Sequence, residues 1–354
     1  MNDRLVRACR RQLVDATPVW FMRQAGRSFA AYRHLRERYG ILELAKTPEL
    51  CAEVTLMPVR DLGVDGAVMF ADIMLPLEPM GVDLRIEPEV GPIIDRPIRS
   101  SADVDHLRPF DAHQVEFTLE AIRIVRRELD GQAGLIGFSG APFTLACYLI
   151  EGRPSRDYAL AKAFMYREPH AWHRLMERLS AMVCTYLDAQ ISAGAEVVQL
   201  FDSWVGGLGP ADYREYVQPH VPAIFEAVTD VPMIHFATGA SGVLELIASA
   251  GGDVIGVDHR MSLADAWRRV GEQRGIQGNL DAARLLAGWD ATRAGAMAVL
   301  EEAGGRPGHV FNLGHGVLPD TEIGLLRRLV DFVHRETATA SPVSAAALPM
   351  EASR

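Results

Sequence analysis

Two arginines four residues apart are the first sign of chemistry in this sequence. Arg23 and Arg27 follow a short apolar run and enclose the turn Gln24-Ala25-Gly26. A guanidinium group is always charged, and its planar fork matches the oxygens of a carboxylate or a phosphate. The pair therefore predicts a clamp for a ligand with several negative charges. The alternative is a solvated loop with ordinary surface arginines.

Polar side chains also follow several other apolar runs. Asp72, Tyr148 and Ser203 each come shortly after such a run, and His315 stands between two glycines that would let a ligand approach closely. Each has a plainer interpretation, because Asp and Ser are favoured helix caps, a tyrosine can be a core aromatic and a histidine can lie in an ordinary turn. His235, inside an apolar run, is more typical of a packed histidine than of a ligand.

The elements that must position these residues are short strands that alternate with helices. Strands are predicted at residues 19–22, 66–70, 135–138, 197–201, 233–236, 254–257, 275–278 and 310–313. Helical patterns occur at 49–62, 116–129, 172–193, 243–248, 263–271, 282–303 and 321–334. The strands are apolar on both faces, as expected of a parallel sheet covered by helices.

Eight strand–helix units predict an α/β protein that forms a single-domain (β/α)8 TIM-type barrel with eight parallel strands. A doubly wound open sheet is the structural alternative. In such a barrel the active site lies at the C-terminal ends of the strands, so the two arginines, Asp72, Tyr148, Ser203 and His315 would meet at one rim. Together they describe a cavity for an anionic ligand that carries N–H groups.

The predicted barrel occupies residues 1–336. Residues 79–112 are rich in Pro, Asp and Arg and predict an excursion between the second and third strands. Residues 337–354 are rich in Ala, Ser and Pro without a sustained period, which predicts a disordered tail.

Composition narrows the possible partners. The net charge of −10 argues against nonspecific nucleic-acid binding, which depends on a basic surface. The N-terminal segment lacks the apolar stretch of a signal peptide, and no run reaches the roughly 18–20 apolar residues of a membrane span. The cysteines are widely separated without metal-type spacing, so we expect no metal site. The sequence predicts a soluble cytoplasmic protein that binds neither nucleic acid nor membrane.

Six segments stand out along the chain: WFMRQAGR at 20–27, FADI at 70–73, GFSGAPFT at 137–144 with Tyr148 beyond it, QLFDS at 199–203, QGNLD at 277–281 and NLGHG at 312–316. They resemble the signature motifs of the uroporphyrinogen decarboxylase family, and they occur in family order. The resemblance implies a distorted (β/α)8 barrel, usually a homodimer, in cytoplasmic haem and tetrapyrrole synthesis. It also implies removal of the four acetate carboxyl groups of uroporphyrinogen III as CO2, giving coproporphyrinogen III without a metal or an organic cofactor.

The resemblance also implies roles for individual residues. Asp72 would accept hydrogen bonds from the pyrrole N–H groups and counter positive charge that develops on the ring. Arg23, Arg27 and the N–H groups of the turn Gln24-Ala25-Gly26 would hold substrate carboxylates, and an arginine, here Arg23, is also a proposed proton donor in the family. Tyr148, Ser203 and His315 would bind the carboxylates or orient the macrocycle.

The chain departs from the family pattern at a few outer positions. Thr238 stands where many members carry a lysine, His259 stands where a tryptophan is usual, and Ala282 stands where a proline is frequent.

Two rival functions share the fold. Zinc-dependent corrinoid methyltransferases need a His-x-Cys pair, but the corresponding stretch here is His235-Phe236-Ala237. A non-catalytic tetrapyrrole-binding barrel predicts loss of Asp72 or the arginines, all of which are present.

Overall fold

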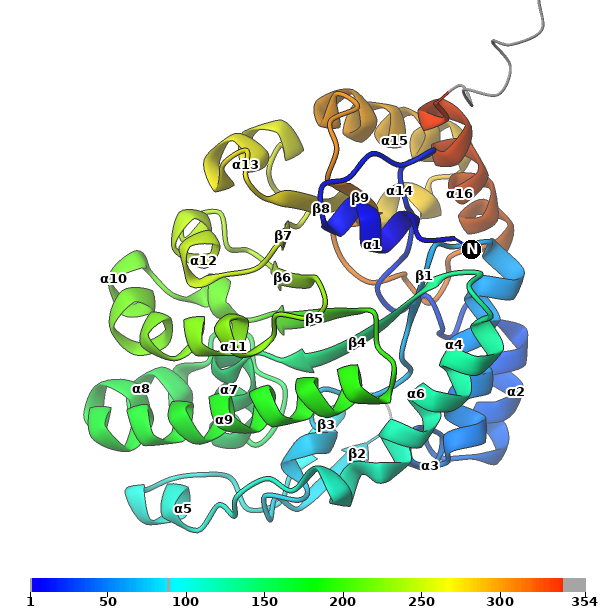
Figure 1. The fold of residues 1–354 in the computed structure, drawn as a ribbon. Helices are drawn as coiled ribbons and strands as arrows, with labels where there is room; N and C mark the ends of the chain where they lie inside the picture. The colour runs from blue at the N-terminus through cyan, green and yellow to red at the C-terminus, as the bar shows by residue number, and fades with distance from the viewer. Residues whose placement is uncertain (1, 88–89, 340–354) are drawn as a thin grey trace, which may run out of the picture.

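The structure is a computed structural model that describes residues 2–87 and 90–339. Its centre is a curved parallel sheet in the order β1-β4-β5-β6-β7-β8-β9, surrounded by helices (Figure 1). The order follows the chain, as the predicted parallel barrel requires, and the α/β barrel class is confirmed. The strands are β1 Gly66–Val68, β4 Gly134–Gly140, β5 Val197–Asp202, β6 Met233–Ala237, β7 Val254–Gly256, β8 Gly275–Leu280 and β9 His309–Leu313.

The predicted first strand, residues 19–22, is not a regular strand. Val19 forms a single isolated parallel bridge with Phe311 of β9, whose N–H donates to the carbonyl of Pro18 (2.9 Å). On its other side, the N–H of Asp65 donates to the Val19 carbonyl (2.7 Å). The segment therefore lies between β9 and the residue that precedes β1, where it closes the sheet into a barrel.

The segment forms no further strand pairing because its next backbone N–H groups donate to side chains instead of to a neighbouring strand. The N–H of Met22 donates to Asn312 Oδ1 (3.3 Å), and the N–H of Phe21 donates to Gln24 Oε1 (3.0 Å). Arg23 follows with φ +58°, a left-handed conformation that costs a non-glycine residue about 1–2 kcal/mol. The prediction of a full eighth strand was therefore wrong, although the segment occupies the eighth position of the barrel.

Helices cover the outside of the sheet. The long predicted helices are confirmed except for 282–303, which divides at Gly288 (φ +92°) because glycine accepts a conformation that interrupts a helix. The helices are α1 Arg4–Cys9, α2 Ala30–Arg38, α3 Ile41–Lys46, α4 Pro48–Leu62, α5 Ser101–Asp105, α6 Glu116–Leu129, α7 Pro142–Glu151, α8 Ala159–Arg167, α9 Pro169–Ala193, α10 Pro210–Asp212, α11 Pro222–Ala227, α12 Leu244–Ala250, α13 Leu263–Val270, α14 Ala283–Leu286, α15 Trp289–Ala303 and α16 Ile323–Thr337.

The barrel interior is filled by side chains and closed at its N-terminal end by α1. A Cβ on Gly66 or Gly134, which begin β1 and β4, would lie 3.1 or 3.3 Å from Leu5 of α1. A polar row crosses the interior, in which Trp20 Nε1 donates to Gln277 (3.0 Å) and Gln277 donates to Gln199 (3.0 Å). Because buried polar groups need such partners, the row fixes how the interior packs below the strand ends.

Residues 79–112 contain an antiparallel hairpin that the sequence did not reveal. β2 Leu84–Glu87 pairs with β3 Gly91–Ile94, and the N–H of Ile94 donates to Gly152 at the end of α7 (2.9 Å). Of the predicted tail at 337–354, Thr337 ends α16 and the N–H of Thr339 donates to Asp15 (2.8 Å). Residues 340–354 lie outside the described residues, so the tail and its boundary remain predictions.

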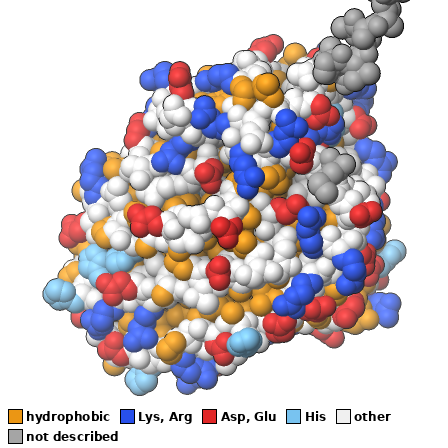
Figure 2. Space-filling view, viewed as in Figure 1, with side chains coloured by type: hydrophobic (Ala, Val, Ile, Leu, Met, Phe, Trp, Pro, Cys, Tyr) orange, Lys and Arg blue, Asp and Glu red, His pale blue; other side chains and the backbone are white. Residues whose placement is uncertain are grey.

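One surface of the molecule carries both signs of charge. Figure 2 shows Lys and Arg side chains interspersed with Asp and Glu side chains over this face. Among the described helices, none combines the length and the apolar character needed to cross a membrane.

Asp65 ties the closing segment to both ends of the described chain. Its buried carboxylate accepts hydrogen bonds from the N–H of Val19 (2.8 Å), His334 of α16 (2.7 Å), Asn2 (2.8 Å) and Arg4 of α1 (3.2 Å). Burial by itself would raise the pKa of Asp65, but the contacts with His334, Asn2 and Val19 lower it below its ordinary value. The ionised carboxylate thus stabilises the closed barrel.

Asp65→Asn should lower the free energy of unfolding by about 3 kcal/mol, because it removes a buried charge that several donors need. Since the folded-state pKa of Asp65 is lowered, the wild type should also become less stable as the pH falls below the ordinary carboxyl value. Urea unfolding measures both effects. Asp265→Asn, which breaks the exposed pair with Arg268, is the control and should change little. Equal stability of the two variants would contradict the role of Asp65.

Candidate active site

The predicted site residues all lie at the C-terminal ends of the parallel strands. Arg23 follows the closing segment, Asp72 follows β1, Tyr148 lies on α7 after β4, Ser203 follows β5 and His315 follows β9. Because neighbouring parallel strands end on the same side, these residues share one rim of the barrel. Their individual surroundings differ and set what each can do.

Arg23 lies against the loop after β9. The N–H of Val317 donates to the carbonyl of Met22 (2.9 Å), and a Cβ on Gly316 would lie 2.6 Å from Arg23 Cδ. Only glycine at position 316 therefore leaves room for the arginine stem beside His315. The Arg23 side chain is exposed at the rim, so its charge is available to a ligand.

Asp72 is the carboxylate of this group, and it is partly exposed. Its Oδ1 accepts from the N–H of Met74 (2.8 Å), whereas its Oδ2 has no donor among the described residues. Burial raises the pKa of Asp72 above its ordinary value, although the Met74 N–H and the nearby charge of Arg23 act in the opposite direction. One carboxylate oxygen is thus held in place while the other can accept hydrogen bonds from a ligand.

Tyr148 is held in a stack of aromatic rings. Its ring centroid lies 4.0 Å from that of Trp204, which in turn stacks on Tyr158 at 4.7 Å. Burial, then the negative charge of Asp72, raise the pKa of Tyr148 well above its ordinary value, against the charge of Arg23. The phenol consequently stays protonated and can donate a hydrogen bond at the rim.

Ser203 directly follows a buried acid that sequence analysis did not single out. Asp202, the last residue of β5, accepts from Thr144 Oγ1 (3.0 Å), which in turn accepts from the N–H of Trp204 (3.3 Å). Burial raises the pKa of Asp202 to about 7, with the Thr144 bond acting in the opposite direction. Strand alternation could have revealed it, because Phe201 faces the barrel interior and the next residue must face the helices.

His315 completes the rim as an exposed imidazole. Burial on one side, then the charges of Arg23 and His259, lower its pKa below the ordinary value. The imidazole is therefore neutral near pH 7 and can either donate or accept a hydrogen bond. A Cβ on Gly314 would lie 2.3 Å from the backbone nitrogen of His259, so this loop packs tightly against the one after β7.

The three residues of the turn Gln24-Ala25-Gly26 have different roles. Gln24 serves the fold, since its side chain is buried and donates to Gly66 (2.9 Å) while its own N–H donates to Phe21 (3.1 Å). Within residues 2–87 and 90–339, the N–H groups of Ala25 and Gly26 have no hydrogen-bond partner. These two amides, rather than the Gln24 amide, are the donors that a bound anion could use.

Arg27 follows the turn and lies near α2. Its side chain is exposed, its charge lies near the hydroxyl of Tyr32 on α2, and its carbonyl accepts from Arg33 (2.7 Å). In the described part of the chain its guanidinium forms no ion pair, which leaves it free for a carboxylate of a large ligand.

Three phenylalanines line the interior just below the rim, and sequence analysis did not include them in the site. Phe138 of β4 meets Phe201 of β5 edge to face at 5.4 Å, and Phe201 meets Phe236 of β6 in the same way at 5.9 Å. Phe138 and Phe236 are nearly buried, and Phe201 is half-buried. An apolar floor under a ring of charged groups suits a flat organic ligand with charged substituents.

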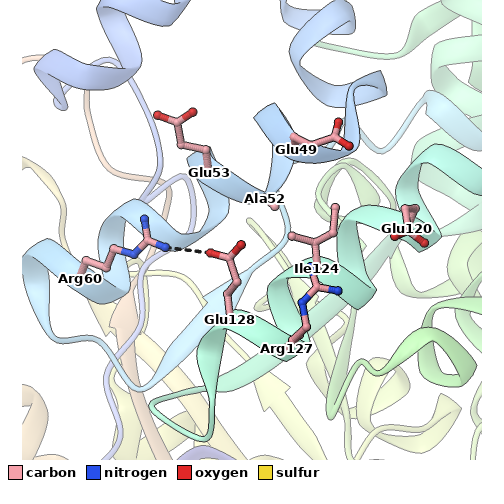
Figure 3. Close-up of a pocket in the computed structure, with 8 residues that line it drawn as sticks. All are labelled: Glu49, Ala52, Glu53, Arg60, Glu120, Ile124, Arg127 and Glu128. Atoms are coloured by element: carbon pink, nitrogen blue, oxygen red, sulfur yellow. Dashed lines mark hydrogen bonds and ion pairs between the residues drawn. The ribbon is translucent and has the colours of Figure 1, made fainter.

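The hollow drawn in Figure 3 is a separate feature. It has a volume of about 400 Å³ and lies between α4 and α6, where Arg60 pairs with Glu128 (3.0 Å) and Glu49, Glu53 and Arg127 line the walls. These helices cover the outside of the barrel, so the hollow is not continuous with the strand ends. The rim, where the polar side chains follow the strand ends, remains the candidate site.

His235 is a packed histidine, as its position in an apolar run indicates. It is fully buried in β6, its ring lies 5.0 Å from that of Phe225 on α11, and burial lowers its pKa to about 4. It therefore faces the helices and not the barrel mouth. Across residues 2–87 and 90–339, no three His, Cys, Asp or Glu side chains are grouped so that they could hold a metal ion.

The sequence matches one known family along nearly its whole length. A family profile described as uroporphyrinogen decarboxylase matches residues 1–336. A protein named uroporphyrinogen decarboxylase from Roseiflexus sp. is 54% identical over 345 residues, covering 95% of this chain and 99% of that protein. One of the same name from Streptomyces coelicolor is 52% identical over 338 residues, with 95% of each chain covered. This chain belongs to the uroporphyrinogen decarboxylase family.

Solved structures of other proteins share the fold of this family member. A methyltransferase from Methanosarcina mazei superposes with a TM-score of 0.80 at 18% identity, covering 95% of this chain and 99% of that one. A putative vitamin-B12-independent methionine synthase from Listeria monocytogenes gives 0.55 at 13% identity, with 92% and 98% covered. At such low identity the similarity concerns the barrel alone. The orientation of His235 adds no support for methyltransferase chemistry.

The pKa of Asp72 in the free protein should exceed the ordinary value of about 3.9, because burial outweighs the Met74 N–H and the Arg23 charge. Arg23→Gln should raise this pKa further by removing the positive charge. Carboxyl ¹³C NMR titration measures both, with Asp72→Asn to assign the signal. An Asp72 titration at or below the ordinary value, or one that Arg23→Gln leaves unmoved, would contradict this electrostatic description.

Proposed function

We propose that this chain converts uroporphyrinogen III to coproporphyrinogen III by removing four acetate carboxyl groups as CO2, without a metal or an organic cofactor. Its membership of the uroporphyrinogen decarboxylase family makes it a carboxy-lyase of haem and tetrapyrrole synthesis. The observation that supports the mechanism is the partly buried Asp72 carboxylate, which has one free oxygen and lies near the charge of Arg23.

The reaction needs an acceptor for the electron pair that CO2 leaves behind. Many decarboxylases use an organic cofactor for this purpose. A pyrrole can supply its own acceptor: protonation at a ring carbon gives a cationic iminium, and the pair from the broken C–C bond flows into it as CO2 departs. A second proton then converts the resulting exocyclic methylene group to methyl, and the ring carbon loses the first proton, which restores the neutral aromatic pyrrole. The protein has to stabilise the cation and hold a substrate that bears up to eight carboxylates.

Asp72 suits the first task. Its free oxygen can accept hydrogen bonds from the pyrrole N–H groups, and its negative charge opposes the positive charge that develops on the ring. The same charges interact more strongly where burial lowers the effective dielectric constant, so the contact gains strength in the transition state. The burial that raises the pKa of Asp72 is also what makes its charge effective.

The arginines and the other rim groups suit the second task. Arg23 and Arg27 offer exposed guanidinium groups, and the unpartnered amides of Ala25 and Gly26 lie between them. Tyr148, Ser203 and His315 add neutral groups that hydrogen-bond carboxylates or orient the macrocycle. Arg23 is also the candidate proton donor, although the high pKa of a guanidinium makes it a weak general acid.

We also infer a cytoplasmic homodimer, which rests on the family resemblance. Light scattering coupled to size exclusion tests the assembly, with a mass of about twice 38.9 kDa expected.

Asp72→Asn should keep the fold, because asparagine has nearly the shape of aspartate. It should lower kcat/KM by at least about 100-fold, because it removes the negative charge that stabilises the cationic ring. Chromatography of the oxidised products measures the loss, since intermediates with seven, six, five and four carboxyls separate. Asp265→Asn, an exposed carboxylate on α13, serves as the matched control. Near-normal turnover in Asp72→Asn would defeat the assigned role.

Arg27→Ala should raise KM by about tenfold with little change in kcat, because the side chain contacts the bound carboxylates and not the reacting ring. Arg268→Ala on α13 provides a comparison, since it also removes an exposed guanidinium. Initial rates over a range of uroporphyrinogen III concentrations separate the two parameters. An unchanged KM would count against the clamp.

A further inference from the structure

The backbone that leads to Asp72 is held by a helix and not by the sheet. β1 ends at Val68, and the last contact of this strand with its neighbour is the bond from the Met69 N–H to Ile136 (3.0 Å). The next residue, Phe70, has both of its backbone polar groups bound by side chains of α4. Its N–H donates to Thr55 Oγ1 (2.9 Å), and its carbonyl accepts from Cys51 Sγ (3.0 Å).

The two side chains of α4 have little freedom of their own. Thr55 is fully buried and Cys51 nearly so. The Thr55 hydroxyl donates to the Cys51 carbonyl (2.8 Å), which leaves its lone pairs for the Phe70 N–H and thereby fixes its direction. Burial raises the pKa of Cys51 to about 12, so the thiol keeps the proton that it donates. The Phe70 ring is also fixed, edge to face against Tyr32 at 5.6 Å.

We propose that Thr55 and Cys51 are positioning residues for the Asp72 carboxylate, acting through the Phe70 peptide two residues before it. Neither side chain lies at the rim, so neither touches substrate. This inference rests on the proposed role of Asp72. A displacement of about 1 Å in a reacting geometry can cost roughly 100-fold in rate, so losing one of the two anchors should reduce turnover even when the fold is retained.

Thr55→Val tests the proposal, because valine has nearly the shape of threonine but cannot accept the Phe70 N–H. We expect kcat with uroporphyrinogen III to fall at least about tenfold while KM changes less than about twofold. Thr55→Ser keeps the acceptor and should recover most of the wild-type kcat. Thr292→Val is the matched control, since Thr292 is also a buried helical threonine that donates to the carbonyl four residues earlier (Gly288, 2.8 Å) but lies on α15. Its kcat should stay within about twofold of wild type.

The outcomes separate positioning from general stability. A fall in kcat confined to Thr55→Val and rescued by Thr55→Ser supports the proposal. An unchanged kcat in Thr55→Val, or an equal fall in Thr292→Val, overturns it. If Thr55→Val does not fold, Cys51→Ala takes its place, with Cys9→Ala on α1 as the buried control. Wild-type protein that releases no CO2 from uroporphyrinogen III would overturn the proposed function itself.

Discussion

The closure of the barrel by an irregular segment is the constraint on which the rest of the structure depends. Seven regular strands leave one position open, and Val19 fills it by bonding to Asp65 on one side and to β9 on the other. The chain then turns at Arg23 with φ +58°. A regular strand would have continued along the sheet, whereas this turn lays the arginine stem over Gly316 at the rim.

The closure also explains why opposite charges lie near each other at the rim. Arg23 arrives from the closing segment and Asp72 from the end of β1, and the two elements are neighbours because Asp65 bonds to Val19. The carboxylate is half-buried, it has no ion-pair partner among the described residues, and its Oδ1 accepts from the Met74 N–H. A carboxylate in these surroundings can stabilise positive charge that develops on a bound ring.

The sequence predicts the parts of this structure that depend on local pattern. Apolar runs located the strands of the sheet, and the polar residues after them located the rim. The remaining features, which the sequence did not predict, depend on hydrogen bonds between residues far apart in the chain. The closing segment could not be foreseen because Asn312, nearly 300 residues away, takes the N–H of Met22. Similarly, nothing local shows that Gln24 binds Gly66 inside the fold, or that Thr55 holds the peptide before Asp72. The hairpin at 84–94 was hidden because each of its strands is only four residues long and β3 begins with Gly91-Pro92.

The central claim is that the Asp72 carboxylate meets the pyrrole nitrogens of the bound macrocycle. A crystal structure of the complex with coproporphyrinogen III, prepared without oxygen, tests it directly. The expected result is a carboxylate oxygen within about 3 Å of the pyrrole N–H groups, with the ring over the phenylalanine floor. A macrocycle bound elsewhere, or an Asp72 side chain directed away from it, would contradict the claim.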